Sequence, residues 1–280
     1  MNIIGILQGR LSRPPAARLQ AFPAASWRDE FAAARACGFG GIEWLVTGDG
    51  LDDNPIWTDR GMAEIRALAA EHEIRLTSLC ADCFIDRPFV RVTAAERQQH
   101  GILLTRLIER SAKAGIGVVL VPVLEGGAIL TEAEADELLG ALGEPLAAAA
   151  RLGIRVGLES DWPGEPLRRL IDRASSPALA AYYDVGNATS MGHDPAGDLR
   201  ALGPVLCGVH IKDRTRGGGS VALGQGDADF PRFFAALAAA GYAGAVILET
   251  PAGPDPVAMA RRNLAHLRGH LPPPLSRAAS

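Results

Sequence analysis

Four residues that can bind a metal ion each close a short apolar run in the second half of this 280-residue chain. They are Glu159, Asp184, His210 and Glu249. If the runs are neighbouring strands of one parallel barrel, their ends meet, and the three crowded carboxylates need a cation to offset their repulsion. Carboxylate and imidazole ligands together suit a fairly hard divalent ion such as Mn²⁺, Mg²⁺ or Co²⁺. The pattern predicts one divalent metal site; the alternative for each residue is a helix cap or an arginine partner.

Other polar residues at the predicted strands are less specific. Lys212 follows His210 by two residues, so in an extended segment both side chains face the same way. A lysine there could place a cation beside an enolate or a phosphate, or it could begin a surface loop. Glu43 lies within an earlier apolar run, and Asp82 and Glu125 each follow one. Each of these acids could contact a substrate or hold a loop.

The four cysteines do not form a disulfide framework. Cys80 and Cys83 make a C-x-x-C pair, a spacing found in redox motifs and in halves of zinc sites. No second pair follows at zinc-finger spacing. The simpler interpretation is two ordinary thiols at the end of a strand, in a reducing compartment.

Eight apolar, β-branched runs position these residues, and segments of helical periodicity separate the runs. The runs cover residues 3–8, 41–45, 75–81, 118–123, 155–159, 179–184, 206–211 and 245–249. None alternates cleanly between polar and apolar residues, as expected for strands covered on both faces. Eight βα units in about 250 residues predict an α/β fold, the (β/α)8 TIM barrel. A doubly wound open sheet is the alternative, but no G-x-G-x-x-G follows the first run.

Capping residues mark the predicted helices between the runs. Ser26 is the predicted N-cap of a helix that ends at Gly38. Thr93 begins a long helix that ends at Gly115, and Asp255 begins the last helix with a proline directly after it.

Composition and charge narrow the class of protein. Apolar residues make up 48% of the chain and the formal net charge is −4. We expect a single domain over residues 1–271 and a flexible tail over residues 272–280. The acidic balance argues against a nucleic-acid partner. No targeting pattern and no membrane-spanning stretch is visible, so a cytoplasmic protein without a membrane partner is expected.

The chain resembles the sugar phosphate isomerase/epimerase family, the xylose-isomerase-like barrels. The motifs that carry the resemblance are GILQGRLS (5–12), GGIEW (40–44), SLCADCF (78–84), GLES (157–160), YDVGNA (183–188), VHIKDR (209–214), LGQGDADF (223–230) and ILET (247–250). They span nearly the whole chain in the family order. The motifs that begin at residues 183, 209 and 223 are most similar to the L-ribulose-5-phosphate (L-xylulose-5-phosphate) 3-epimerase branch.

The resemblance implies roles for particular residues. The implied ligands of one divalent ion are Glu159, Asp184, His210 and Glu249. The two glutamates would also flank the substrate carbon and move its proton. Glu165 and Arg216 occupy places at which related ketose epimerases contact sugar hydroxyls. Asn187 stands where free-ketose epimerases usually carry a histidine, which makes a non-phosphorylated ketose less favoured.

These features predict C3 epimerisation of a ketose phosphate through a cis-enediolate. Loss of the weakly acidic C3 proton builds charge on the C2 oxygen, which a divalent cation stabilises. Alternatives are an inosose dehydratase, a hydroxypyruvate or ketose–aldose isomerase, and a non-catalytic sugar-binding barrel. An apurinic endonuclease of the same superfamily fits the charge and the six histidines poorly. A small-molecule sugar or sugar phosphate is the expected partner, and a homodimer or tetramer the expected assembly.

Overall fold

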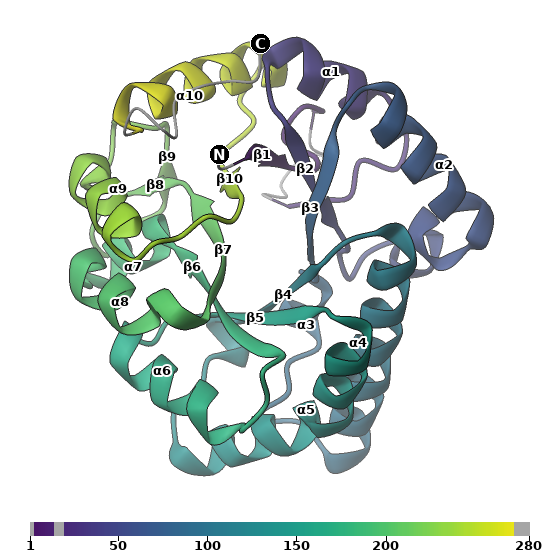
Figure 1. Cartoon of the computed structure of the whole chain (residues 1–280), viewed down its shortest axis with the longest axis vertical. Helices are drawn as coiled ribbons and strands as arrows, with labels where there is room; N and C mark the ends of the chain where they lie inside the picture. Colours follow the sequence, from purple (N-terminus) through teal and green to yellow (C-terminus); the bar gives the residue numbers. More distant parts are fainter. Residues whose placement is uncertain (1–2, 14–19, 272–280) are drawn as a thin grey trace.

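The computed structural model describes residues 3–13 and 20–271. Within these residues, eight parallel strands close into a barrel in the order β1-β10-β7-β6-β5-β4-β3-β2 (Figure 1). The barrel strands are β1 (Ile4–Leu7), β2 (Gly41–Leu45), β3 (Arg75–Cys80), β4 (Val118–Val123), β5 (Arg155–Ser160), β6 (Leu179–Asp184), β7 (Leu206–Ile211) and β10 (Val246–Leu248). The predicted TIM barrel is confirmed. The predicted tail over residues 272–280 lies outside the described residues.

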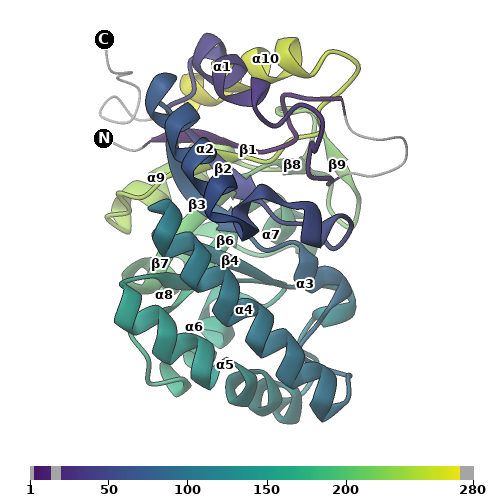
Figure 2. The same cartoon turned by 90° about the vertical axis from the view of Figure 1, so that its right-hand side faces the viewer.

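Helices surround the barrel on its outside (Figure 1). They are α1 (Asp29–Cys37), α2 (Asp59–Glu71), α3 (Cys83–Asp86), α4 (Ala94–Ala114), α5 (Glu132–Leu152), α6 (Gly164–Arg173), α7 (Val185–Met191), α8 (Pro195–Leu202), α9 (Phe230–Ala239) and α10 (Pro256–His270). The two long helices α4 and α5 pack side by side, as Figure 2 shows. A short antiparallel hairpin, β8 (Asp213–Arg214) with β9 (Ser220–Val221), follows β7. Among the described helices, none has the length and apolar character needed to cross a bilayer.

Capping explains where most of these helices begin and end. The Thr93 side chain accepts a hydrogen bond from the Glu96 backbone and the Glu96 side chain binds the Thr93 backbone, a complete capping box at the start of α4. Gly115 ends α4 at φ 80°, a conformation that favours glycine. The prediction for Ser26 was wrong: α1 begins at Asp29, and the Ser26 hydroxyl lies 2.8 Å from that of Ser12. A serine in a turn can therefore be satisfied by another side chain rather than by a helix end.

Parallel pairing brings the ends of the last four strands to one level. Asp184 is the register partner of His210 across β6 and β7. Ile247 of β10 pairs with His210, so Glu249 lies just beyond the carboxyl end of the next strand. Because the register is set along each strand pair, residues that close neighbouring runs end up side by side at one mouth of the barrel.

Tyr182 fills the barrel interior below that mouth. Its ring occupies the space over Gly208, where an added Cβ would lie 2.0 Å from the Tyr182 Cε2 atom. The ring also stacks edge-on against His210, with the ring centroids 4.7 Å apart. Only glycine at position 208 leaves room for the tyrosine, and the tyrosine in turn supports the histidine of the barrel mouth.

Candidate metal centre

The four predicted ligands converge at the carboxyl ends of β5, β6, β7 and β10. Each of Glu159, Asp184, His210 and Glu249 offers one ligand atom, and these atoms all lie within 4.8 Å of one another. Two ligands on opposite sides of an ion with bonds of about 2.1 Å would lie about 4.2 Å apart. A single divalent ion therefore fits the cluster with small side-chain adjustments.

The donor set and its burial also fit a cation. In the described part of the chain, Asp184 Oδ2 and His210 Nδ1 are buried and make no hydrogen bond, although each lies near oppositely charged groups. Buried polar atoms without hydrogen bonds are uncommon in folded proteins, and a bound ion is one explanation for them. Three buried carboxylates beside one imidazole form a hard, mostly oxygen-donating set. The cluster thus fits a divalent metal site.

Glu43 determines how His210 presents itself. The His210 Nε2 atom lies 2.5 Å from Glu43 Oε2, and both side chains are fully buried. Glu43 also accepts hydrogen bonds from the Ser78 hydroxyl at 2.5 Å and the Tyr182 hydroxyl at 2.8 Å. A carboxylate that accepts a hydrogen bond from Nε2–H leaves Nδ1 facing Glu249, 3.0 Å away. Glu43 therefore orients the imidazole toward the cluster instead of contacting a substrate or holding a loop.

Lys212 and Asn187 connect to the carboxylates. The Lys212 ammonium lies 3.0 Å from both Asp184 Oδ2 and Glu249 Oε2. Asn187 donates from Nδ2 to Glu159 Oε1 at 2.8 Å. Both side chains are buried, so Lys212 is not a surface lysine and supplies a positive charge inside the cluster.

Burial and neighbouring charges shift the acids of this site in opposite directions. Burial, and after it the charge of Asp184, raises the pKa of Glu159 to about 8. Burial also acts to raise the pKa of Glu249, but Lys212 and His210 outweigh it and hold that pKa well below its usual range. Burial acts to lower the pKa of His210, but the charges and hydrogen bonds of Glu43 and Glu249 together outweigh it and hold that pKa well above its usual value. The isolated cluster therefore retains protons that a cation would displace.

A pocket of about 370 Å³ opens directly over the cluster. Glu159, Glu249 and Lys212 line it together with Asp82 and Glu125, the acids whose roles the sequence left open. Burial and the charge of Glu249 raise the pKa of Asp82 to about 7. The volume of this pocket suits a small ligand, and most of the residues that line it are polar or charged.

Three further residues reach the pocket or its carboxylates without having been predicted. Gln20 donates from Nε2 to Glu249 Oε1 at 2.5 Å. The Arg10 guanidinium lies 3.9 Å from the same oxygen and is buried. Arg214 lines the pocket and donates to Asn187 Oδ1 at 2.8 Å. Arg10 and Arg214 lie within the quoted motifs, but no sequence signal marked Gln20.

Glu165 and Arg216 are not brought to this pocket. Glu165 lies at the start of α6 with its side chain 77% exposed and bound to Arg169. Arg216 lies in the turn of the β8–β9 hairpin, exposed, and its backbone N–H donates to Asp227. Their proposed contacts with sugar hydroxyls stay predictions that the described geometry does not support.

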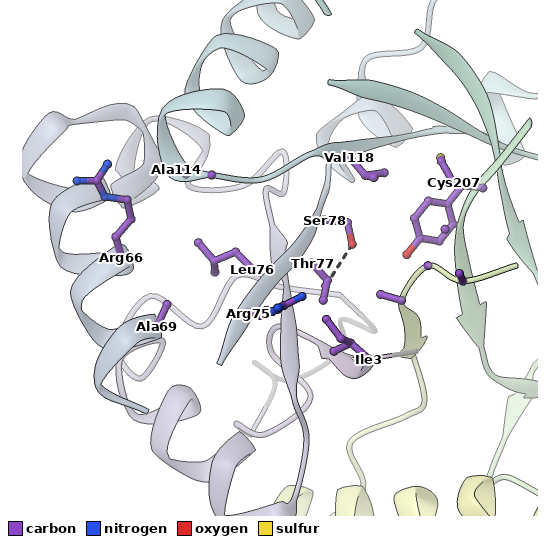
Figure 3. Close-up of a pocket in the computed structure, with 16 residues that line it drawn as sticks. Ile3, Arg66, Ala69, Arg75, Leu76, Thr77, Ser78, Ala114, Val118 and Cys207 are labelled. Atoms are coloured by element: carbon purple, nitrogen blue, oxygen red, sulfur yellow. Dashed lines mark hydrogen bonds between the residues drawn. The ribbon is translucent and has the colours of Figure 1, made fainter. Parts of the chain in front are cut away.

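A second cavity lies at the opposite mouth of the barrel. It has a volume of about 650 Å³ and is lined by Ile3, Arg75, Val118 and Cys207 at or near the amino ends of strands (Figure 3). Among the described residues that line it, no group of three metal-ligating side chains occurs. In TIM barrels the amino-end face serves stability rather than chemistry. Although this cavity is larger, the pocket over the carboxylates is the candidate active site.

The C-x-x-C pair behaves as two ordinary thiols. Cys80 and Cys83 are free and buried. Burial raises the pKa of the Cys83 thiol to about 12, and burial together with Glu43 raises the pKa of the Cys80 thiol well above its usual value. Redox and zinc chemistry use the thiolate, which these surroundings disfavour.

Comparison with known proteins places this geometry in a family context. The family model described as "Xylose isomerase-like TIM barrel" matches residues 31–270. L-ribulose-5-phosphate 3-epimerase UlaE of Salmonella paratyphi A is 26% identical over 247 residues, covering 82% of this chain and 84% of the relative. Putative L-ribulose-5-phosphate 3-epimerase SgbU of Haemophilus influenzae is 25% identical, covering 80% and 83%.

Solved structures share the fold. A structure of L-ribulose 3-epimerase superposes with a TM-score of 0.79 at 19% identity, covering 97% of this chain and 95% of the other. D-allulose 3-epimerase from Methylomonas sp., solved with D-allulose, gives a TM-score of 0.76 at 20% identity, covering 96% and 97%. At these identities the similarity establishes the barrel architecture.

Proposed function

Because this chain belongs to the xylose isomerase-like TIM barrel family, we propose that it is a divalent-metal-dependent sugar isomerase/epimerase. The more specific reaction that we propose is C3 epimerisation of a ketose phosphate through a cis-enediolate. The observation that carries the proposal is the convergence of three carboxylates and one imidazole within 4.8 Å at the barrel mouth. Relatives named as L-ribulose-5-phosphate 3-epimerases support the substrate class.

Inversion at C3 requires a proton to leave one face of the sugar and another to arrive on the opposite face. Glu159 lies at the carboxyl end of β5 and Glu249 directly follows β10, and these two strands flank β6 and β7 in the barrel. Carboxylates on the two sides of a bound ketose can therefore remove the C3 proton and return one, help worth about 10²–10⁴-fold in rate. A bound Mn²⁺, Mg²⁺ or Co²⁺ ion would supply the positive charge that stabilises the developing enediolate.

Buried neighbours prepare the two glutamates for this task. Asn187 holds Glu159 through a hydrogen bond of 2.8 Å, and Lys212 holds Glu249 at 3.0 Å. In this proposal Lys212 also places a cation near the sugar oxygens, and Asn187 lines the pocket in which the sugar binds. The expected cytoplasmic location and homo-oligomeric assembly stay predictions.

Deuterium exchange tests the proposed reaction. Purified protein with Mn²⁺ is incubated in D₂O with L-ribulose 5-phosphate, with free L-ribulose, and with further ketoses and ketose phosphates, and the products are followed by NMR. We expect deuterium at C3 together with the C3 epimer. Deuterium at C2 of an aldose product, with deuterium at C1 of the recovered ketose, would instead indicate a ketose–aldose isomerase, and loss of a hydroxyl would indicate a dehydratase. No exchange with any of these sugars would contradict the proposal.

Matched variants connect exchange to the carboxylates. Glu159→Gln and Glu249→Gln preserve side-chain shape and remove the proton-accepting charge, so both should lose exchange by at least about 10²-fold. Glu64→Gln is the control, because Glu64 lies on the surface of α2, paired with Arg28. Dialysis against a chelator should abolish exchange, and added Mn²⁺ should restore it.

A further inference from the structure

Two histidines on the last helix face one another across one helical turn. His266 and His270 lie four residues apart on α10, and their Nε2 atoms are 3.2 Å apart. The Phe230 ring packs against both, with centroid distances of 5.9 Å to His266 and 5.8 Å to His270. The pair shares no residue with the pocket over the carboxylates.

The two Nε2 atoms lie within hydrogen-bond distance, and their spacing also fits chelation of one ion. With metal–nitrogen bonds of about 2.1 Å, nitrogens at this separation subtend about 99° at an ion, between the octahedral and tetrahedral values. Adding about 1.1 Å from each nitrogen to its ring centre, chelation places the centroids about 4.9 Å apart, whereas a linear N–H···N bond places them about 5.4 Å apart. The centroids are 4.7 Å apart, near the chelating value, so the spacing of the rings and of their nitrogens is compatible with both binding one ion.

The surroundings leave these rings available as ligands. Both side chains are half-buried, which limits their motion without excluding an ion from solvent. Burial and the neighbouring His270 lower the pKa of His266, and a neutral imidazole is the form that binds metals. The nearby carboxylate of Asp213 accepts hydrogen bonds from the backbone N–H groups of Gly224 and other residues of its loop. Its hydrogen bonds therefore go to the loop and not to the two imidazole rings.

We propose that His266 and His270 form a second metal site, a two-histidine chelate for Zn²⁺, Ni²⁺ or Cu²⁺ with water as the remaining ligands. Imidazole nitrogen suits these ions, whereas the carboxylate cluster suits harder ions. The two sites therefore differ in ion preference. The His266 ring also lies against Gly224, where an added Cβ would approach His266 Cε1 to 2.6 Å. The proposed site thus lies beside the loop that follows the β8–β9 hairpin.

Zinc stoichiometry of the untagged protein tests this site. By equilibrium dialysis we expect two zinc ions per chain in the wild type and one in His266→Ala and in His270→Ala. His72→Ala, at the end of α2, is the matched control and should keep two. Asp184→Asn should lose the other ion and keep the one at the pair. Equal zinc binding by the wild type and by both single variants of the pair would overturn the proposal.

A measurement on the wild type does not depend on the variants folding. Electron paramagnetic resonance of the protein loaded with Cu²⁺ should show one population coupled to two equivalent nitrogens. Spectra with coupling to a single nitrogen at every loading would overturn the assignment. If the carboxylate cluster binds no ion, the wild type should bind one zinc and His270→Ala none. Failure of the epimerase proposal is thus distinguishable from failure of this one.

Discussion

Replacing Glu43 with glutamine should weaken metal binding without changing any of the four ligands. In the wild type, the Glu43 carboxylate accepts a hydrogen bond from His210 Nε2 at 2.5 Å and further hydrogen bonds from the Ser78 and Tyr182 hydroxyls. A glutamine that keeps its oxygen toward Ser78 and Tyr182 turns its amide N–H groups toward His210. The imidazole must then accept at Nε2 and carry its proton on Nδ1, the nitrogen that faces the cluster.

The expected size follows from the loss of this partner. Carboxylates that accept a hydrogen bond from a metal-binding histidine are typically worth about 10–100-fold in metal affinity, or about 1.4–2.7 kcal/mol. The contact is short and fully buried, so we expect a value toward the upper end of that range. Isothermal titration with Mn²⁺ at constant pH measures the dissociation constant directly.

A second variant distinguishes the loss of His210 orientation from general destabilisation of the fold. Tyr182→Phe keeps the ring that packs under His210 and removes one donor to Glu43, so its loss of affinity should be smaller than that of Glu43→Gln. Thermal melts without metal check that each variant remains folded. If folded Glu43→Gln bound Mn²⁺ as tightly as the wild type, Glu43 would not orient His210 and the reasoning would be wrong.

Three further predictions concern protons and helix ends. Binding of Mn²⁺ should release protons and weaken as the pH falls, because His210 and Glu159 have raised pKa values without a cation; titration in buffers of different ionisation enthalpy measures this release. Burial raises the pKa of Glu30 from 4.5 to about 7, so the folded chain keeps a proton that the unfolded chain has lost. The free energy of unfolding should therefore fall as the pH rises from about 4.5 to 7, and it should fall less in Glu30→Gln. Urea titrations at several pH values measure this free energy. The same dependence on pH in the wild type and in Glu30→Gln would contradict the prediction. Thr93→Ala breaks the capping box of α4 and should cost about 1 kcal/mol of unfolding free energy, against no measurable change for Thr105→Ser within the same helix.

The order of elements and the ligands of the candidate site were readable from sequence for a definite physical reason. A strand of a parallel barrel is covered on both faces, so it appears as an apolar run, and a polar residue that closes such a run must lie at the barrel mouth. Asp184 and His210 are direct register partners, as expected for residues that close consecutive runs. Local signals were also sufficient for Thr93 and Gly115, because helix caps depend on neighbouring backbone groups.

Contacts between distant segments were decided only by the tertiary structure. Glu43 and His210 are 167 residues apart, and nothing local distinguishes an acid that orients an imidazole from one that holds a loop. Gln20 reaches Glu249 across 229 residues for the same reason. His266 and His270 were not singled out from sequence, because the side-chain directions that bring their nitrogens together depend on packing against Phe230. Sequence periodicity determines which groups reach one mouth of the barrel, whereas their pairing depends on packing between chain segments that meet only after folding.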